Sequence, residues 1–200
     1  MPTFSDLGIQ KDFVKALKEL DIKIPTDIQE KAIPVLLESP TDFIGLAQTG
    51  TGKTAAFGLG LLEKLEVKRF RIQSIVLCPT RELADQVANE IRRLARSIHN
   101  IKVLTLCGGK PFGPQIGSLE HGAHIIVGTP GRIEEHIRKG SLALDNVSMF
   151  VLDEADRMLE MGFQDALEKI AEAIPAKKQT LLFSATFPKG IEKIANRFLN

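Results

Sequence analysis

Short apolar runs recur along the chain, and segments with a helical pattern separate them. The runs are nearly continuous rather than alternating, which is typical of strands buried on both faces of a parallel sheet. The predicted strands are Phe43–Ala47, Ser74–Cys78, Val103–Leu106, Ile125–Val127, Met149–Leu152 and Thr180–Phe183. The predicted helices are Lys11–Leu20, Asp27–Glu38, Lys53–Leu65, Leu83–Ser97, Ile133–Lys139, Gln164–Ile174 and Gly190–Phe198. This alternation predicts an α/β fold with a doubly wound, mostly parallel sheet and helices on both faces.

Length and composition narrow the class of protein. Two hundred residues, 44% of them hydrophobic and 26% charged, suit one ordinary α/β domain. Because there is neither a long apolar run nor a signal-like start, we expect no membrane contact and a cytoplasmic location. Cys78 and Cys107 are interpreted as buried thiols, with a disulfide as the less favoured alternative. The net charge of +1 gives no electrostatic argument for nucleic acid.

A glycine loop follows the first predicted strand and leads into a helical segment. It reads Ala47-Gln48-Thr49-Gly50-Thr51-Gly52-Lys53-Thr54, and a strand, a loop and a helix in this order are the context of a phosphate-binding P-loop. Amides of Thr49, Gly50, Thr51 and Gly52 would surround the phosphates at a helix N-terminus. Lys53 would reach the β- and γ-phosphates, and Thr54 would ligate Mg²⁺. The alternative is a glycine-rich turn with a solvated lysine.

A second group of polar residues closes the strand Met149–Leu152. Asp153, Glu154 and Asp156 follow it directly. Carboxylates at the carboxyl end of a strand near a P-loop predict a Walker B site, in which Asp153 holds Mg²⁺, through water, and Glu154 orients and deprotonates the attacking water. The alternative is a helix start that is rich in acids because of the helix dipole.

The Asp-Glu-Ala-Asp sequence at 153–156 resembles the signature of the DEAD-box RNA helicases, and the whole chain resembles the first RecA-like domain of that family. Pro25-Thr26 with Gln29 is similar to the Q motif, which implies that Gln29 reads adenine and that the upstream Phe4 stacks on the base. Motif III is matched by Ser184-Ala185-Thr186, which implies that Ser184 and Thr186 couple the nucleotide site to RNA through Asp156. Motifs Ia, GG and Ib imply RNA contacts by Pro79, Thr80, Arg81, Gly108, Gly109, Thr129, Pro130, Gly131 and Arg132.

Local roles compete with these assignments. Gln29 also completes a capping box with Thr26, and the two roles can coexist. Thr80 can cap a helix, and Ser184 and Thr186 can end a strand before the Phe187-Pro188 break. Asp21-Ile22 stands where the family often has Gly-Phe, which removes an aromatic side chain beneath the expected adenine.

The resemblance implies ATP and Mg²⁺ as cofactors and RNA as a partner of a monomer. Residues 1–40 would be a Q-motif helical segment, and residues 41–200 would be the first RecA-like domain. No arginine-finger motif of a second RecA-like domain is present, so we expect a fragment that binds nucleotide and hydrolyses it weakly. Two alternatives stay open: a P-loop ATPase of another class, such as a DNA translocase, and a nucleotide-binding module without turnover.

Overall fold

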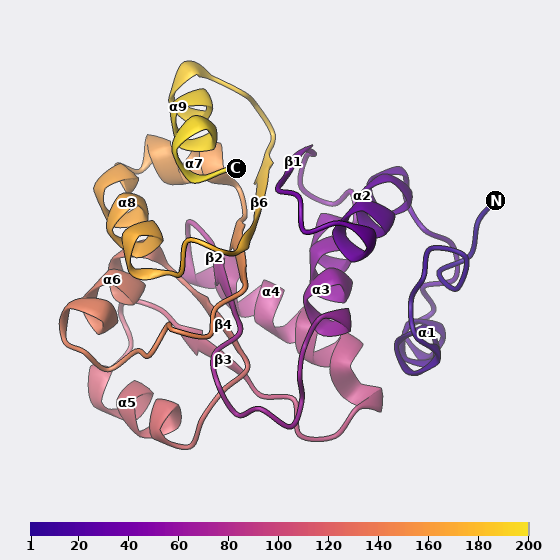
Figure 1. Ribbon diagram of the computed structural model, residues 1–200, viewed down its shortest axis with the longest axis horizontal. Coiled ribbons are helices and arrows are strands. Elements are labelled where there is room, and N and C mark those ends of the chain that lie inside the picture. The colour runs from indigo at the N-terminus through magenta and orange to yellow at the C-terminus, as the bar shows by residue number, and fades with distance from the viewer. Residues whose placement is uncertain (200) are drawn as a thin grey trace.

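The computed structural model describes residues 1–199 and contains a six-stranded sheet between layers of helices (Figure 1). The strand order is β1-β6-β5-β2-β4-β3, and every pairing is parallel. The predicted fold class is therefore confirmed, with a sheet that is entirely rather than mostly parallel. The strands are β1 Phe43–Leu46, β2 Ser74–Leu77, β3 Val103–Leu106, β4 Ile125–Gly128, β5 Met149–Leu152 and β6 Gln179–Ser184.

All seven predicted helices occur, with shifted ends in several cases. The helices are α1 Lys11–Glu19, α2 Asp27–Glu38, α3 Lys53–Glu63, α4 Arg81–Leu94, α5 Phe112–Glu120, α6 Pro130–Arg138, α7 Ala155–Glu160, α8 Gln164–Ala173 and α9 Lys189–Phe198, and a short 3₁₀ helix, η1, covers Ala95–Ser97. The sequence analysis missed α5 and α7. Gly113, Pro114 and Gly117 lower the helix propensity of α5, although Pro114 lies in its first turn, where backbone N–H groups need no helical acceptor.

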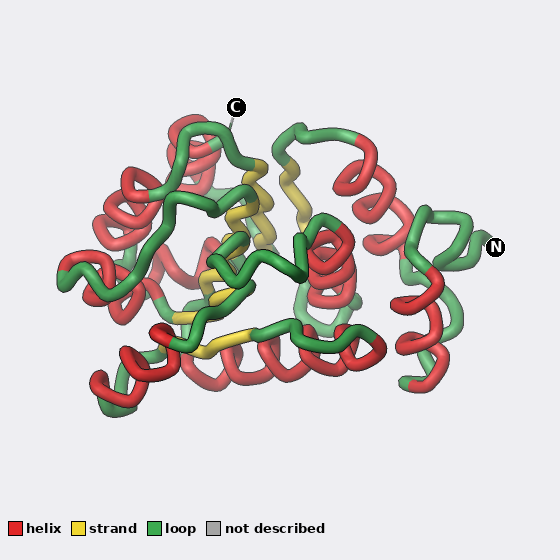
Figure 2. The backbone as a smooth tube through the Cα atoms, turned by 60° about the horizontal axis from the view of Figure 1, so that its bottom comes forward, coloured by secondary structure: helices red, strands yellow, loops and turns green. Residues whose placement is uncertain are grey.

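The strands bury side chains on both faces, which explains their nearly continuous apolar runs. On β2, Val76 belongs to one core cluster, whereas Ile75 and Leu77 belong to the other. Helices α1 to α4 contribute to the first cluster, and α6 to α9 contribute to the second. In Figure 2 the strands run between these helical layers. The loops at the carboxyl ends of the strands remain free for a site, as is usual in open α/β sheets.

The first forty residues pack on the same core as the sheet. Phe13 and Leu17 of α1 and Ile33 and Leu36 of α2 are fully buried in the first cluster. Helix α2 continues through Pro34. The predicted division between residues 1–40 and 41–200 therefore coincides with the change from helices to the first strand. That it is a domain boundary stays a prediction.

Both cysteines are buried free thiols. Cys78 follows β2 and Cys107 follows β3, and β4 lies between these strands. Two strand spacings of about 4.8 Å separate their backbones by more than a disulfide spans. Within residues 1–199 no helix combines the length and the apolar character needed to cross a bilayer.

Candidate functional site

The glycine loop joins β1 to α3 in a conformation that depends on glycine. Gly50 and Gly52 have φ angles of 82° and 85°, in the left-handed region that suits glycine. A Cβ on Gly52 would lie 2.6 Å from Nε2 of Gln29, so this position also lacks room for a side chain. At the other end of the loop, the amide of Ala47 donates to the carbonyl oxygen of Ser184 at 3.0 Å. The loop is thus anchored to β6 and to the segment before β1.

Lys53 is the first residue of α3 and connects the loop to the acids after β5. Its Nζ lies 3.0 Å from Oδ1 of Asp153 and 3.8 Å from Oε1 of Glu154. Its side chain is only 5% exposed. The alternative of a solvated surface lysine is therefore wrong.

Asp153 is a buried carboxylate with few partners for its charge. Beyond the ion pair with Lys53, neither carboxylate oxygen has a hydrogen-bond partner in the described part of the chain. Burial raises the pKa of Asp153, and Lys53 partly offsets that rise. A divalent cation can bind such a desolvated, unsatisfied carboxylate and offset the free-energy cost of burying its charge. Asp153 and the Thr54 hydroxyl therefore fit Mg²⁺, which prefers a few oxygen ligands completed by water and phosphate.

Glu154 is held in a sparsely populated backbone conformation. Its φ is 53° at the start of α7, an uncommon value for a residue with a side chain. Oε1 accepts a hydrogen bond of 3.1 Å from the Thr49 hydroxyl, and Oε2 lies 3.5 Å from Nη1 of Arg157. The carboxylate of Glu154 is thus directed to the glycine loop. Backbone strain of the kind shown by its φ angle is common at functional sites.

A cavity of about 290 Å³ lies between the glycine loop and α4. Thr49, Lys53, Thr54 and Glu154 line it, as expected from the sequence. Helix α4 supplies residues that the sequence analysis missed: Leu83, Gln86, Val87 and Glu90. Their spacing places them on one helix face, but that spacing alone does not show which neighbour the face meets. Burial raises the pKa of Glu90.

Gln29 connects the capping box of α2 to the glycine loop. Its Oε1 accepts from the Thr26 amide, and its Nε2 donates to the carbonyl oxygen of Gly52, both at 3.0 Å. The Thr26 hydroxyl donates to the carbonyl oxygen of Thr51 at 2.9 Å. Phe4 is 3% exposed and packs in the first core cluster. The structure thus places Gln29 directly against the loop, and the stacking role of Phe4 stays a prediction.

The residues expected to contact RNA follow β2, β3 and β4, which are neighbours in the sheet. The Thr80 hydroxyl accepts from the Leu83 amide and caps α4. A Cβ on Gly109 would lie 3.2 Å from Nη1 of Arg81, and the Gly108 amide donates to the Thr129 hydroxyl at 3.3 Å. These motifs therefore form one rim, which we call the glycine rim, with Pro79, Thr80, Arg81, Gly108, Gly109, Thr129, Pro130 and Gly131.

The two arginines of these motifs differ in exposure. The Arg81 side chain is 47% exposed, whereas that of Arg132 is 12% exposed. Arg132 donates to the carbonyl oxygen of Lys110 and to Oε1 of Gln115, so protein acceptors already use both hydrogens of Nη1.

Asp156 connects the start of α7 to the end of β6. Its Oδ2 accepts from both the amide and the hydroxyl of Thr186, at 3.1 and 2.9 Å. The Ser184 hydroxyl donates to the carbonyl oxygen of Thr186 and so supports the same turn. Burial alone would raise the pKa of Asp156, but the hydrogen bonds donated by Thr186 and Arg157 outweigh it and lower that pKa.

Comparison with known proteins assigns the family. The family described as "DEAD/DEAH box helicase" matches residues 26–194. The chain belongs to the DEAD/DEAH box helicase family. It is 55% identical over 198 residues to "ATP-dependent RNA helicase DbpA" of Escherichia coli, covering 98% of this chain and 43% of that protein. It is 48% identical over 200 residues to "DEAD-box ATP-dependent RNA helicase CshA" of Geobacillus kaustophilus, covering 100% of this chain and 42% of that protein. The chain thus spans less than half the length of these relatives.

Solved structures agree with the family. A DEAD box protein from Methanococcus jannaschii superposes with a TM-score of 0.95 at 44% identity, over 99% of this chain and 54% of the other. Dbp5 of Saccharomyces cerevisiae bound to RNA and ADP BeF3 superposes with a TM-score of 0.90 at 32% identity, over 100% of this chain and 50% of the other.

Proposed function

We propose that this chain is the ATP-binding first domain of an ATP-dependent RNA helicase that separates RNA duplexes locally by ATP hydrolysis. The observation that carries this proposal is the buried contact between Lys53 and Asp153 at 3.0 Å, with Glu154 at 3.8 Å. It supports a site in which Lys53 is the phosphate-binding cation, Asp153 the metal-binding carboxylate and Glu154 the general base; Lys53 and Glu154 line the cavity, and the buried Asp153 lies behind them. Two segments 100 residues apart in the chain thus supply complementary parts of one reaction.

In the proposed site, the amides of Gly50, Thr51 and Gly52 bind the phosphates, and Lys53 binds the β- and γ-phosphate oxygens. Asp153 and Thr54 would hold Mg²⁺, which would supply positive charge to the transferred phosphoryl group. Glu154 orients the attacking water and accepts its proton, because its carboxylate is fixed at the loop by Thr49.

Base recognition is assigned to Gln29 and Phe4. The side-chain amide of Gln29 has two donors and two acceptor lone pairs, and the structure uses one of each. One donor and one lone pair remain for the N7 and N6 edge of adenine. Because Gln29 also binds the Gly52 carbonyl, base recognition would be mechanically connected to the phosphate loop.

RNA binding is assigned to the glycine rim. A net charge of +1 gives the chain little overall attraction to nucleic acid, so backbone amides and Arg81 would contact phosphate and sugar. The structurally similar Dbp5 is bound to RNA, which supports this partner. Asp156 and Thr186 would transmit the nucleotide state to this rim.

Full turnover would require a second RecA-like domain. The relatives named above are more than twice as long as this chain. An arginine finger contributes about 10³–10⁵ to phosphoryl transfer. We therefore propose that the chain alone binds nucleotide and hydrolyses it weakly, as a monomer.

Replacement of the phosphate-binding lysine tests the nucleotide site. Lys53→Ala should lower ATP affinity at least about tenfold in titration calorimetry, because a charge-assisted contact is lost. The exposed Lys68→Ala serves as the matched control and should bind normally. Undiminished ATP affinity in a folded Lys53→Ala protein would contradict the loop assignment.

The choice of nucleic acid separates this proposal from the translocase alternative. ATP turnover of the full-length protein should rise with RNA and not with DNA of the same sequence, because the 2′-hydroxyl is part of the recognised shape. Equal stimulation by both would favour the alternative class of ATPase.

A further inference from the structure

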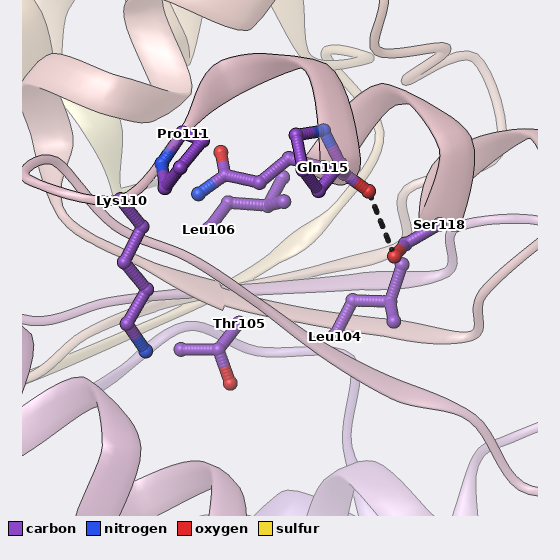
Figure 3. A pocket seen from close by; sticks show the side chains of 8 residues that line it. Leu104, Thr105, Leu106, Lys110, Pro111, Gln115 and Ser118 are labelled. Atoms are coloured by element: carbon purple, nitrogen blue, oxygen red, sulfur yellow. Dashed lines mark hydrogen bonds between the residues drawn. The ribbon is translucent and has the colours of Figure 1, made fainter.

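A buried polar network lies behind the glycine rim, between α5 and α6. Gln115 of α5 and His136 of α6 are both buried, and Oε1 of Gln115 lies 2.8 Å from Nε2 of His136. The same oxygen accepts from Arg132 Nη1 at 3.1 Å. Figure 3 shows Gln115 reaching from α5 towards the strand that carries Leu106. No role assigned above uses Gln115 or His136.

Arg132 fixes the direction of the hydrogen bonds that the Gln115 side chain makes. Because a guanidinium can only donate, the atom of Gln115 that faces Arg132 must be the carbonyl oxygen. His136 Nε2 must then carry the proton that it donates to the same oxygen. The remaining donor, Nε2 of Gln115, binds the carbonyl oxygen of Cys107 at 3.2 Å. On the other side, His136 Nδ1 lies 2.7 Å from the Ser141 hydroxyl.

The network holds both ends of the Gly108–Gly109 turn. Gln115 binds the carbonyl oxygen of Cys107, just before the turn. Arg132 binds the carbonyl oxygen of Lys110, just after it, at 2.8 Å. The turn itself has few constraints of its own, since Gly109 has a φ of 76° and neither glycine has a side chain to pack.

An aromatic ring completes the arrangement. Phe112 stacks on the His136 ring at a centroid distance of 4.2 Å, and the Arg132 guanidinium lies 5.6 Å from the same ring centroid. Arg132 Nε also pairs with Glu135 at 3.0 Å. Arg132 is therefore held by Phe112, Glu135, Gln115 and the turn, and its side chain, 12% exposed, offers little surface to an external phosphate.

We propose that Gln115, Arg132 and His136 are positioning residues for RNA binding, which hold the Gly108–Gly109 turn in the geometry that accepts a phosphate. This inference rests on the proposed function. In this proposal Arg132 positions the turn instead of making the direct RNA contact that the family resemblance implies. Arg81 is then the arginine of the rim that contacts an RNA phosphate.

A pair of glutamine variants in the full-length protein tests the positioning role. Gln115→Met should lower the affinity for single-stranded RNA about tenfold or more, because the turn loses one hydrogen bond directly and another through Arg132. Its ATP affinity should stay within about twofold. Gln73 is the matched control, since it is equally buried and makes three hydrogen bonds in the loop before β2, away from the rim. Gln73→Met should change neither affinity more than about twofold.

A pair of arginine variants separates positioning from charge. Each phosphate that a protein cation neutralises adds about 0.7 to the slope of log affinity against log salt for single strands. Arg81→Met should reduce that slope by about 0.7. Arg132→Met should lower RNA affinity with an unchanged slope, and it carries the test alone if Gln115→Met does not fold.

Two results would overturn the positioning role. One is RNA affinity of wild-type strength in folded Gln115→Met, and the other is a slope reduced in Arg132→Met as much as in Arg81→Met. A wild-type protein with no measurable RNA affinity would instead remove the proposed function itself.

Discussion

The cavity beside the glycine loop and the glycine rim lie along the same edge of the sheet, but they differ in how their buried polar groups are hydrogen-bonded. Beside the cavity, the buried Asp153 carboxylate pairs with Lys53 but has no hydrogen-bond partner among residues 1–199, and Glu154 has a strained backbone. Behind the rim, Gln115 and His136 are also buried, and each has partners on both polar atoms. The buried carboxylate beside the cavity thus lacks hydrogen-bond partners in the described part of the chain, whereas the buried polar groups behind the rim find their partners within the protein.

The difference follows from what each region is proposed to bind. A metal–triphosphate site needs carboxylates whose remaining valence is completed by the ligand, so the protein leaves them unsatisfied. A site made of backbone amides carries no formal charge. Its binding of a phosphate therefore depends on the position in which the turn holds those amides. Among the described residues, the unsatisfied carboxylate thus lies beside Lys53 at the cavity wall, and the complete network lies behind the rim.

The largest expected effect tests the cavity side. Glu154→Gln should reduce RNA-stimulated ATP turnover of the full-length protein about 10²–10⁴-fold, because it removes a general base. ATP and RNA affinities should stay close to those of the wild type, since neither the metal ligand nor the rim is changed.

The exposed Glu160→Gln on the same helix is the control and should turn over ATP normally. Normal turnover in Glu154→Gln would remove Glu154 from its role and leave its backbone strain without a functional reason.

An intermediate effect is expected at the contact that we propose couples the two regions. Thr186→Ala removes the hydroxyl that donates to Asp156 at 2.9 Å, and the amide contact at 3.1 Å remains. Loss of one hydrogen bond to a carboxylate should reduce duplex separation about tenfold while ATP turnover changes less. A gel-based unwinding assay beside a phosphate-release assay measures both.

Thr3 donates to Asp6 through its amide and hydroxyl in the same pattern, on the exposed N-terminal segment. Thr3→Ala should leave the ratio of unwinding to turnover unchanged. An equal ratio in Thr186→Ala and the wild type would separate Asp156 from coupling.

The smallest expected effect tests the rim. Burial lowers the pKa of His136 from its ordinary value of 6.5, and Arg132 adds to this, while Glu135 opposes it and Lys139 adds slightly. Below pH 6.5 the unfolded chain therefore binds a proton that the native state resists, so stability falls as the pH falls. Guanidinium unfolding at several pH values should show this slope.

The His136→Gln protein should lose part of that pH dependence relative to the wild type. Equal pH slopes in both proteins would show that the native network accepts a protonated His136. ATP affinity, measured in parallel, should not follow this difference, because the histidine lies behind the rim and not in the cavity.

Some features were predictable because their causes are local. The apolar runs predicted all six strands, and strands covered on both faces leave such runs in any parallel sheet. The P-loop was predictable because Gly50, Gly52 and Lys53 stand at fixed spacing between a strand and a helix. Helix α5 was not, because its glycines and proline are poor helix formers, and packing beside β3 holds them.

By itself, the sequence determined the strands, the phosphate loop and the acids, because each depends on neighbours in the chain. Only the tertiary structure decided that Lys53 meets Asp153, that α4 lines the cavity and that Arg132 faces inward to Gln115 and Lys110. These contacts join segments that are distant in sequence. Their partners are set by the order of strands in the sheet, which no local pattern of residues contains.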